Sequence, residues 1–89
     1  MRHTPIFKEA LEQCRKRLAE NPNFPPLNSI EEQLKYLIAV DEGKQTDLSR
    51  LKDINLGLLA VREFEPHDME FAKLLHDVSY RVEEMRFGR

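Results

Sequence analysis

The stretch "INLGLLAVREFE", residues 54–65, is the least ambiguous apolar run in the chain, and it decides the fold class. Leu and Ala dominate it and apolar residues do not alternate with polar ones, so a helix is favoured over a strand. On a helical wheel the apolar side chains occupy nearly the whole circumference, and Arg62 and Glu63 share one minor arc. A helix that is apolar all round is typical of a buried position. Residues 54–64 are therefore predicted to form a central buried helix, in which Gly57 lets a neighbouring helix come close.

The segment after this run has the strongest helical periodicity in the chain. Its apolar side chains follow the i, i+3, i+4, i+7 spacing and are Phe71, Leu74, Leu75, Val78, Val82 and Met85. Asp68 precedes them and is suited to cap the helix N-terminus. The spacing predicts a helix over 67–87 with Tyr80 on its outward face, and a short helical turn is predicted over 47–52, before the central helix.

The first helix is predicted over residues 4–20. Thr4 and Pro5 form a good helix start, because a Thr oxygen can cap free amides and Pro is tolerated where its missing N–H costs nothing. Cys14 belongs to the apolar stripe of this helix and is expected to be a small core residue rather than a reactive thiol. The proline-rich loop that follows is expected to be a stiff connector.

The second helix is predicted over residues 29–42. Ser29 and Glu32 match a capping box at its start, and Gly43 suits the left-handed conformation that ends it. Asp41 is anomalous, because it falls near the apolar stripe and places a negative charge at the C-terminal end of the helix dipole. Two explanations stay open: a frayed and solvated last turn, or a charge held for an Arg of this protein or of a partner.

Length and composition define the class of protein. A chain of 89 residues suits one domain spanning 1–89, and 34% charged with 40% hydrophobic residues is ordinary for a soluble protein. No apolar run approaches the ~20 residues of a membrane span, and no secretory signal is evident at the N-terminus. The prediction is a small cytoplasmic all-α protein, a single-domain bundle of about four helices around the central third one.

The sequence offers little for catalysis or cofactor binding. Basic and acidic residues number 14 and 16, which argues against a nucleic-acid binder, and Arg15–Arg17 is more simply a solvated helix face. The "EPHD" segment brings Glu65, His67 and Asp68 together, but Asp68 is already explained as a helix cap. No metal-ligand spacing, nucleophile motif or phosphate loop is present. We expect no enzyme, no cofactor, no metal and no membrane association; what remains is a binding module.

Two motifs extend this interpretation by resemblance. "SIEEQLKYLIAV" follows the pattern E-x-Q-L-x-Y, and "LGLLAVREFEPHDMEFAKLL" follows L-G-x-x-A-V-[KR]-E-F-x-x-x-D-x-E. Together they cover about the second two-thirds of the chain and resemble the small immunity proteins that neutralise NAD(P)-hydrolysing effector toxins of the bacterial type VI secretion system. The resemblance implies an all-α cytoplasmic antitoxin that binds its cognate toxin, blocks the NAD-binding cleft by occlusion and catalyses nothing itself. The alternative is a helical adaptor or regulatory subunit that bridges host proteins through the Tyr80 face.

The toxin-binding surface is predicted on the exposed side of the second helix and the loop after it. This stretch is acidic, and carboxylates suit a toxin cleft that is built for an anionic dinucleotide. Arg62 and Glu63 are either an interface pair or an internal pair that holds the central helix to its neighbours. The candidate contact residues are Glu31, Glu32, Lys35, Tyr36, Asp41, Glu42, Asp47, Arg50, Arg62 and Glu63.

Overall fold

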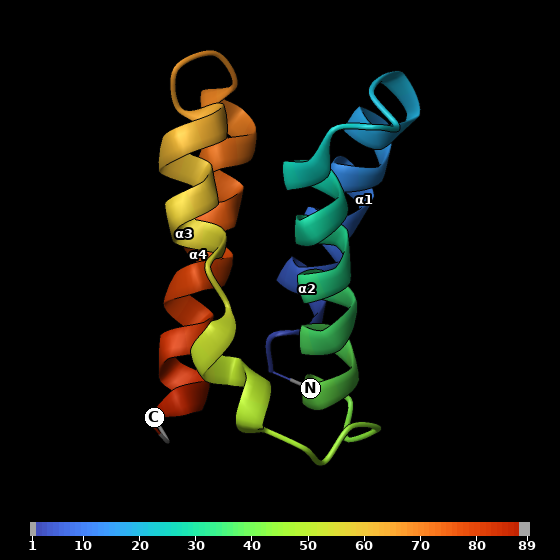
Figure 1. Cartoon of the computed structure of the whole chain (residues 1–89). Helices are drawn as coiled ribbons and strands as arrows, with labels where there is room; N and C mark the ends of the chain where they lie inside the picture. The colour runs from blue at the N-terminus through green and yellow to red at the C-terminus, as the bar shows by residue number, and fades with distance from the viewer. Residues whose placement is uncertain (1, 88–89) are drawn as a thin grey trace. The chain divides into compact units, whose positions relative to one another are not determined.

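The computed structural model describes residues 2–87, and all the regular elements in this range are helical (Figure 1). Four are α-helices, one is a 3-10 helix and one is a π-helix. In chain order they are α1 (Thr4–Glu20), α2 (Pro25–Asp41), η1 (Ser49–Asp53), α3 (Leu56–Leu59), the π-helical η2 (Ala60–Phe64) and α4 (Met69–Arg86). Residues 2–87 contain no strand, and the all-α prediction is confirmed.

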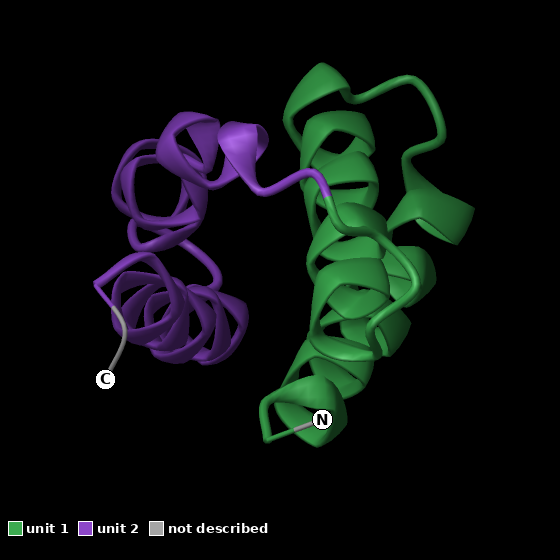
Figure 2. Cartoon of the chain, turned by 90° about the horizontal axis from the view of Figure 1, so that it is seen from below, with its two compact units in different colours: residues 1–46 green, residues 47–89 purple. Residues whose placement is uncertain are grey.

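The chain divides into two compact units (Figure 2). Unit 1 comprises residues 1–46 and contains α1 and α2, whereas unit 2 comprises residues 47–89 and contains η1, α3, η2 and α4. Each unit is a helical hairpin with its own buried side chains. The single domain expected over 1–89 stays a prediction, because it requires the two units to unfold together.

Unit 1 is a pair of antiparallel helices of 17 residues each (Figure 1). Its apolar stripes face each other, and the fully buried side chains are Phe7, Ala10 and Cys14 of α1 and Ile30, Leu34 and Leu37 of α2. The Cys14 thiol is 3.4 Å from the Leu27 carbonyl oxygen, and burial raises its pKa to about 12. Cys14 is therefore a core residue, as predicted.

The start of α2 differs from the prediction. The helix begins at Pro25, four residues before the expected start at Ser29, and the Ser29 hydroxyl accepts a hydrogen bond from Gln33 Nε2 at 3.0 Å instead of capping the helix. The reason is that a proline in the first turn needs no N–H partner and has a helical φ already. Pro25 and Pro26 thus open the helix, and Pro22 stays in the connecting turn.

The termination of α2 agrees with the prediction. Gly43 follows the helix with a φ of +79°, in the left-handed region that glycine adopts without strain. The amide of Lys44 then reaches back to the Ala39 carbonyl at 2.9 Å, which satisfies one of the free carbonyls at the helix end. Gly43 is therefore the helix stop.

Unit 2 pairs α4 with the helical segment formed by α3 and η2. Leu56, Ala60 and Phe64 are buried along one side of this segment, at i, i+4 and i+8, and Phe64 packs edge-on against Phe71 with ring centroids 4.9 Å apart. The predicted contact at Gly57 is confirmed, since a Cβ there would lie 3.0 Å from Ser79 Oγ of α4. Asp68 caps α4 as expected, accepting from the Phe71 amide at 3.4 Å.

Residues 56–64 are helical, as predicted, but the expectation that this helix is buried all round is wrong. Leu58 is 52% exposed and Val61 is 49% exposed, so the segment buries one face and leaves another open. Its last turn widens to π geometry, with the Glu65 amide donating to the Ala60 carbonyl five residues earlier at 2.9 Å. The apolar pattern of a helix indicates which of its faces can be buried. The elements that pack against the helix decide which faces are buried.

Candidate functional site

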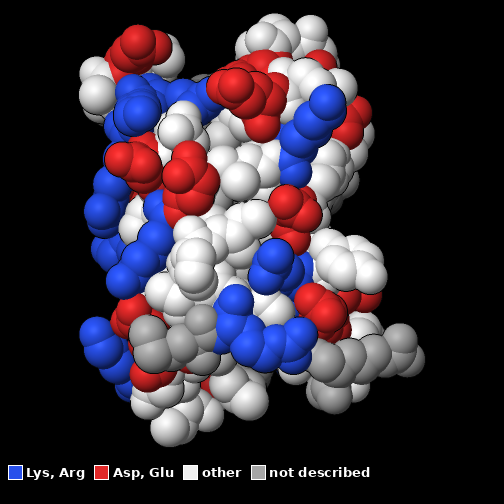
Figure 3. All heavy atoms as spheres, turned by 180° about the vertical axis from the view of Figure 1, so that it is seen from behind, with Lys and Arg blue, Asp and Glu red and all other residues white. Residues whose placement is uncertain are grey.

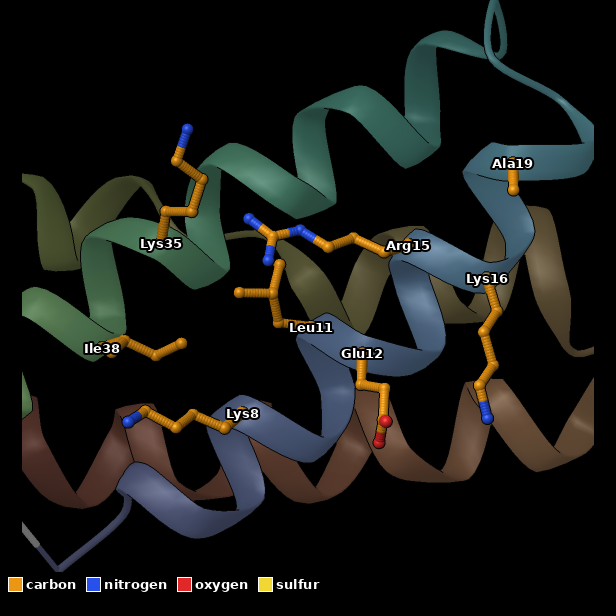
Figure 4. Close-up of a pocket in the computed structure, with 8 residues that line it drawn as sticks. All are labelled: Lys8, Leu11, Glu12, Arg15, Lys16, Ala19, Lys35 and Ile38. Carbon is orange, nitrogen blue, oxygen red and sulfur yellow. The ribbon is translucent and has the colours of Figure 1, made fainter.

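A groove of about 740 Å³ lies between α1 and α2 within unit 1 (Figure 4). Its lining residues are Lys8, Leu11, Glu12, Arg15, Lys16, Ala19, Lys35 and Ile38. Leu11 lies near the middle of these residues, Ile38 and Lys8 lie toward one end, and Lys16 and Ala19 lie toward the opposite end (Figure 4). The groove therefore combines an apolar centre with four basic side chains and one carboxylate.

The sequence builds this groove through helical spacing. Lys8, Leu11, Arg15 and Ala19 recur at intervals of three and four residues, so they share one face of α1. Leu11 lies at the edge of the apolar stripe and is half-buried, as is Ile38 on α2. The two helices are thus in contact through their buried stripes and leave a channel where the stripe edges meet.

Three ion pairs surround the groove. Arg15 Nε lies 3.1 Å from Glu31 Oε2, and Lys8 Nζ lies 3.1 Å from Glu42 Oε2; both pairs join α1 to residues of α2 or its end. Lys35 Nζ is 3.2 Å from Glu32 Oε2 within α2. The lysine side chains of these pairs are exposed, so the pairs contribute little to stability and hold the carboxylates at the surface.

Of these three carboxylates, Glu42 has two basic partners. Its second oxygen lies 3.2 Å from Lys44 Nζ, in addition to the Lys8 contact. The hydrogen bonds from Lys8 and then Lys44 lower the pKa of Glu42 below its ordinary value. Its charge is therefore present throughout the neutral range.

Four of the predicted contact residues gather at this groove. Lys35 lines it, and Glu31, Glu32 and Glu42 pair with basic side chains of its wall. Glu32 is an exposed side chain, whereas Glu31 and Glu42 are more protected beside their partners. These four residues and the groove lining define the α1–α2 face.

The anomaly at Asp41 has a structural explanation that neither expectation included. Asp41 Oδ2 accepts hydrogen bonds from the His3 amide at 2.9 Å and from Thr4 Oγ1 at 2.5 Å. Thr4 is thus not the cap that the sequence suggested; its hydroxyl donates to a carboxylate from the end of α2. Desolvation by partial burial opposes ionisation, but the bonds from Thr4 and His3 outweigh it and lower the pKa of Asp41.

This bonding changes the role expected for Asp41. Its carboxylate faces the positive N-terminal end of α1, so the charge that is unfavourable on its own helix is favourable on the neighbouring one. Asp41 thus fastens the two helices of unit 1 together, which gives its charge a structural role. Its place among the toxin contacts stays a prediction.

Tyr36 also departs from the prediction. It was expected on the exposed side of the second helix, but it is only 7% exposed. Leu37 beside it is fully buried as well, so Tyr36 lies on the flank of the buried stripe of α2. Tyr36 is therefore a structural residue of α2 and not an open contact side chain.

The remaining candidates belong to unit 2. Asp47 accepts a hydrogen bond from the Ser49 amide at 3.0 Å at the start of η1, and Arg50 is exposed in η1. Arg62 is exposed and Glu63 is half-buried, and neither forms an ion pair with another of the described residues. The internal pair that was one explanation for Arg62 and Glu63 is absent from residues 2–87, and the interface explanation stays a prediction.

The sequence interpretation missed the contribution of α1. Five residues of α1 line the groove, although Arg15–Arg17 are expected from the sequence to be only a solvated face; they are Lys8, Leu11, Arg15, Lys16 and Ala19. The signal that was available is the shared spacing of these residues on one face of α1. The spacing does not reveal that α2 lies beside that face.

The chemistry that this arrangement supports is binding. Within residues 2–87 no group of three or more His, Cys, Asp or Glu side chains is placed to hold a metal ion, and no helix is both long and apolar enough to cross a membrane. Glu65 contacts His76 Nε2 at 2.7 Å, on α4, so the "EPHD" segment is used for packing of unit 2. Acidic and basic side chains are interspersed on the face drawn in Figure 3.

Comparisons with known proteins place this geometry in a family. The Tsi6 family model matches residues 2–84. Immune protein Tsi6 of Pseudomonas aeruginosa is 38% identical over 79 residues, which cover 86% of this chain and 84% of that protein. A chain in the structure of Tse6 in complex with Tsi6 matches with a TM-score of 0.92 and 33% identity, covering 99% of this chain and 94% of that one. The structure of Tsi6 from Pseudomonas aeruginosa matches with a TM-score of 0.84 and 34% identity, covering 89% and 82%. The chain belongs to the Tsi6 family.

Proposed function

We propose that this protein is an immunity protein that binds a cognate effector toxin similar to Tse6. The observation that carries the proposal is the likeness of nearly the whole chain to a chain in the complex of Tse6 with Tsi6, at a TM-score of 0.92. The curated relative is named an immune protein, and the identity of 38% to it extends over most of both chains. The toxin is an NAD(P)-hydrolysing effector of a type VI secretion system, as the sequence motifs imply.

The inhibition is steric. The protein covers the NAD-binding cleft of the toxin and performs no reaction of its own, in the cytoplasm of the cell that it protects. The α1–α2 face suits this task because Glu31, Glu32 and Glu42 are held at its surface by flexible basic side chains. Carboxylates placed in this way can occupy donors and positive charges that otherwise bind the phosphates of a dinucleotide.

The proposal is tested with the toxin domain encoded beside the gene for this chain. Co-expression is expected to restore growth and the cellular NAD level, and the purified proteins are expected to form a complex without NAD turnover by the immunity protein. Growth arrest and NAD loss that persist with the folded protein present would refute the immunity function. Turnover of NAD by the purified protein alone would refute the purely binding role.

The placement of the interface is tested by charge reversal. The double variant Glu31→Lys with Glu32→Lys is expected to keep its melting temperature within a few degrees and to weaken toxin binding by about 2 kcal/mol, roughly 30-fold. The matched control is Asp77→Lys with Glu83→Lys, two exposed carboxylates of α4. If the control pair or Tyr80→Ala abolishes binding while the first pair binds normally, the interface lies on α4.

A further inference from the structure

The centre of the α1–α2 groove is apolar and open. Leu11 and Ile38 are half-buried although both belong to helices that bury their neighbouring stripe residues completely, and the exposed Ala19 extends the apolar surface toward one end. Their side chains are among those that line the groove in Figure 4. The volume of about 740 Å³ is sufficient for several side chains of a bound segment.

The basic side chains of the groove wall differ in whether they have a carboxylate partner. Arg15, Lys35 and Lys8 each have a carboxylate partner within unit 1. The Lys16 side chain, at the Ala19 end, has no ion pair or hydrogen bond to any other described residue, and the same holds for the Glu12 carboxylate of the lining. Lys16 is therefore the one basic side chain of the lining that is not paired with a carboxylate among residues 2–87, and it lies next to an apolar floor.

We propose that the α1–α2 groove receives a segment of the effector toxin that carries one or two large apolar side chains and a carboxylate. The apolar side chains pack on Leu11 and Ile38, and the carboxylate pairs with Lys16 at the Ala19 end. This inference rests on the proposed function, since it names the chemistry of the toxin surface that the immunity protein recognises. It adds a contact of opposite sign to the one made by Glu31 and Glu32.

Charge complementarity favours an acidic segment over a neutral one. Arg15, Lys35 and Lys8 are already paired with Glu31, Glu32 and Glu42, so the positive charge that is available to a carboxylate of a partner is that of Lys16. The three ion pairs are exposed and individually weak, so Arg15 and Lys8 can exchange their own carboxylates for those of a partner at little cost. Such an exchange of ion-pair partners between the two proteins uses both the acidic and the basic side chains of the α1–α2 face.

The first test is reversal of the Lys16 charge. Lys16→Glu is expected to weaken binding of the neighbouring-gene toxin domain at least tenfold, mostly through slower association at low salt, with an unchanged melting temperature. Lys16→Arg retains the charge and is expected to bind like the parent. The matched control is Lys73→Glu, an exposed α4 lysine that also has no ion pair with a described residue; it is expected to bind like the parent.

The second test removes the apolar floor. Leu11→Gln keeps the helix and the approximate volume and is expected to weaken binding at least tenfold by faster dissociation, whereas Leu58→Gln, at an exposed apolar side chain of unit 2, serves as control. Parental affinity in both Lys16→Glu and Leu11→Gln, each shown to be folded by circular dichroism, would overturn the groove inference alone. Failure of the unmodified protein to bind the toxin would overturn the proposed function, so the two failures are distinguishable.

Discussion

Both units of this protein are helical hairpins, but their helices differ in regularity. In unit 1, α1 and α2 are both regular helices of 17 residues. In unit 2, α4 has 18 residues, but its partner consists of the four-residue α3 followed by the π-helical η2. The α3–η2 segment is thus less regular than α1, although it is the more apolar of the two.

The difference teaches that hydrophobicity and burial are separate properties of a segment. The α3–η2 segment exceeds α1 in apolar character, yet it leaves Leu58 and Val61 about half exposed. α1 contains six basic or acidic residues between Lys8 and Arg17 and still buries Phe7 and Cys14 completely. A helix is buried only as far as neighbouring elements cover it, whatever its composition permits.

The largest expected effect is the difference in stability between substitutions on the buried and on the exposed side of the α3–η2 segment. Leu56→Asp places an uncompensated charge at a fully buried position and is expected to cost several kcal/mol, which is enough to unfold a small protein of ordinary stability. Leu58→Asp changes a half-exposed side chain and is expected to cost about 1 kcal/mol or less. Urea denaturation followed by circular dichroism measures both. Equal destabilisation would mean that this segment is buried all round, as its composition alone suggested.

The next largest effect concerns the fastening of unit 1 by Asp41. Asp41→Asn keeps the shape but weakens the hydrogen bonds from the His3 amide and Thr4 hydroxyl, and we expect a loss of about 1 to 2 kcal/mol at pH 7. The folded protein lowers the pKa of Asp41 below its ordinary value of 3.8, so the stabilisation is complete above that pH and disappears as the pH falls through the folded-state pKa.

The pH dependence makes this prediction specific. Urea denaturation of the parent and Asp41→Asn at pH 7, 5 and 3 is expected to give a difference that is largest at pH 7 and 5 and smaller at pH 3. Asp77→Asn, at an exposed carboxylate of α4, is the control. A difference between parent and Asp41→Asn that stays constant from pH 7 to pH 3 would show that the ionised carboxylate does not fasten α1.

The smallest expected effect tests the end of α2. Gly43→Ala is expected to cost about 1 kcal/mol, because a side chain at a φ of +79° meets its own backbone even though no other atom lies within 4 Å of the added Cβ. Gly43→Asn is expected to cost less, since Asn tolerates the left-handed conformation. Thermal denaturation of the three proteins gives the order. Equal melting temperatures for parent and Ala variant would contradict the strain argument.

Local chemistry explains which features were predictable. The stripe of α4, the Asp68 cap, the Gly43 stop and the close approach at Gly57 all depend on a few neighbouring residues or on the size of one side chain. Such features are encoded within one or two helical turns. The family resemblance was also visible in two short motifs, because a linear pattern of residues is enough to carry it.

The candidate site was predictable only in part, for the opposite reason. Glu31, Glu32, Lys35 and Glu42 were found from their charges on α2, but the basic side chains of Lys8 and Arg15 that hold them come from α1. Asp41 seemed misplaced on its own helix because its partners, His3 and Thr4, are 38 and 37 residues away in the sequence. Pairings across such separations leave no periodic signal.

The sequence by itself determined the helical class, the length and stripe of α4, the helix stop at Gly43 and the family to which the chain belongs. Only the tertiary structure decided which side of the α3–η2 segment is covered, what Asp41 binds and where the groove opens between α1 and α2. The physical reason is that propensity and capping act between residues a few positions apart, whereas coverage and ion pairing depend on which helices pack together in three dimensions.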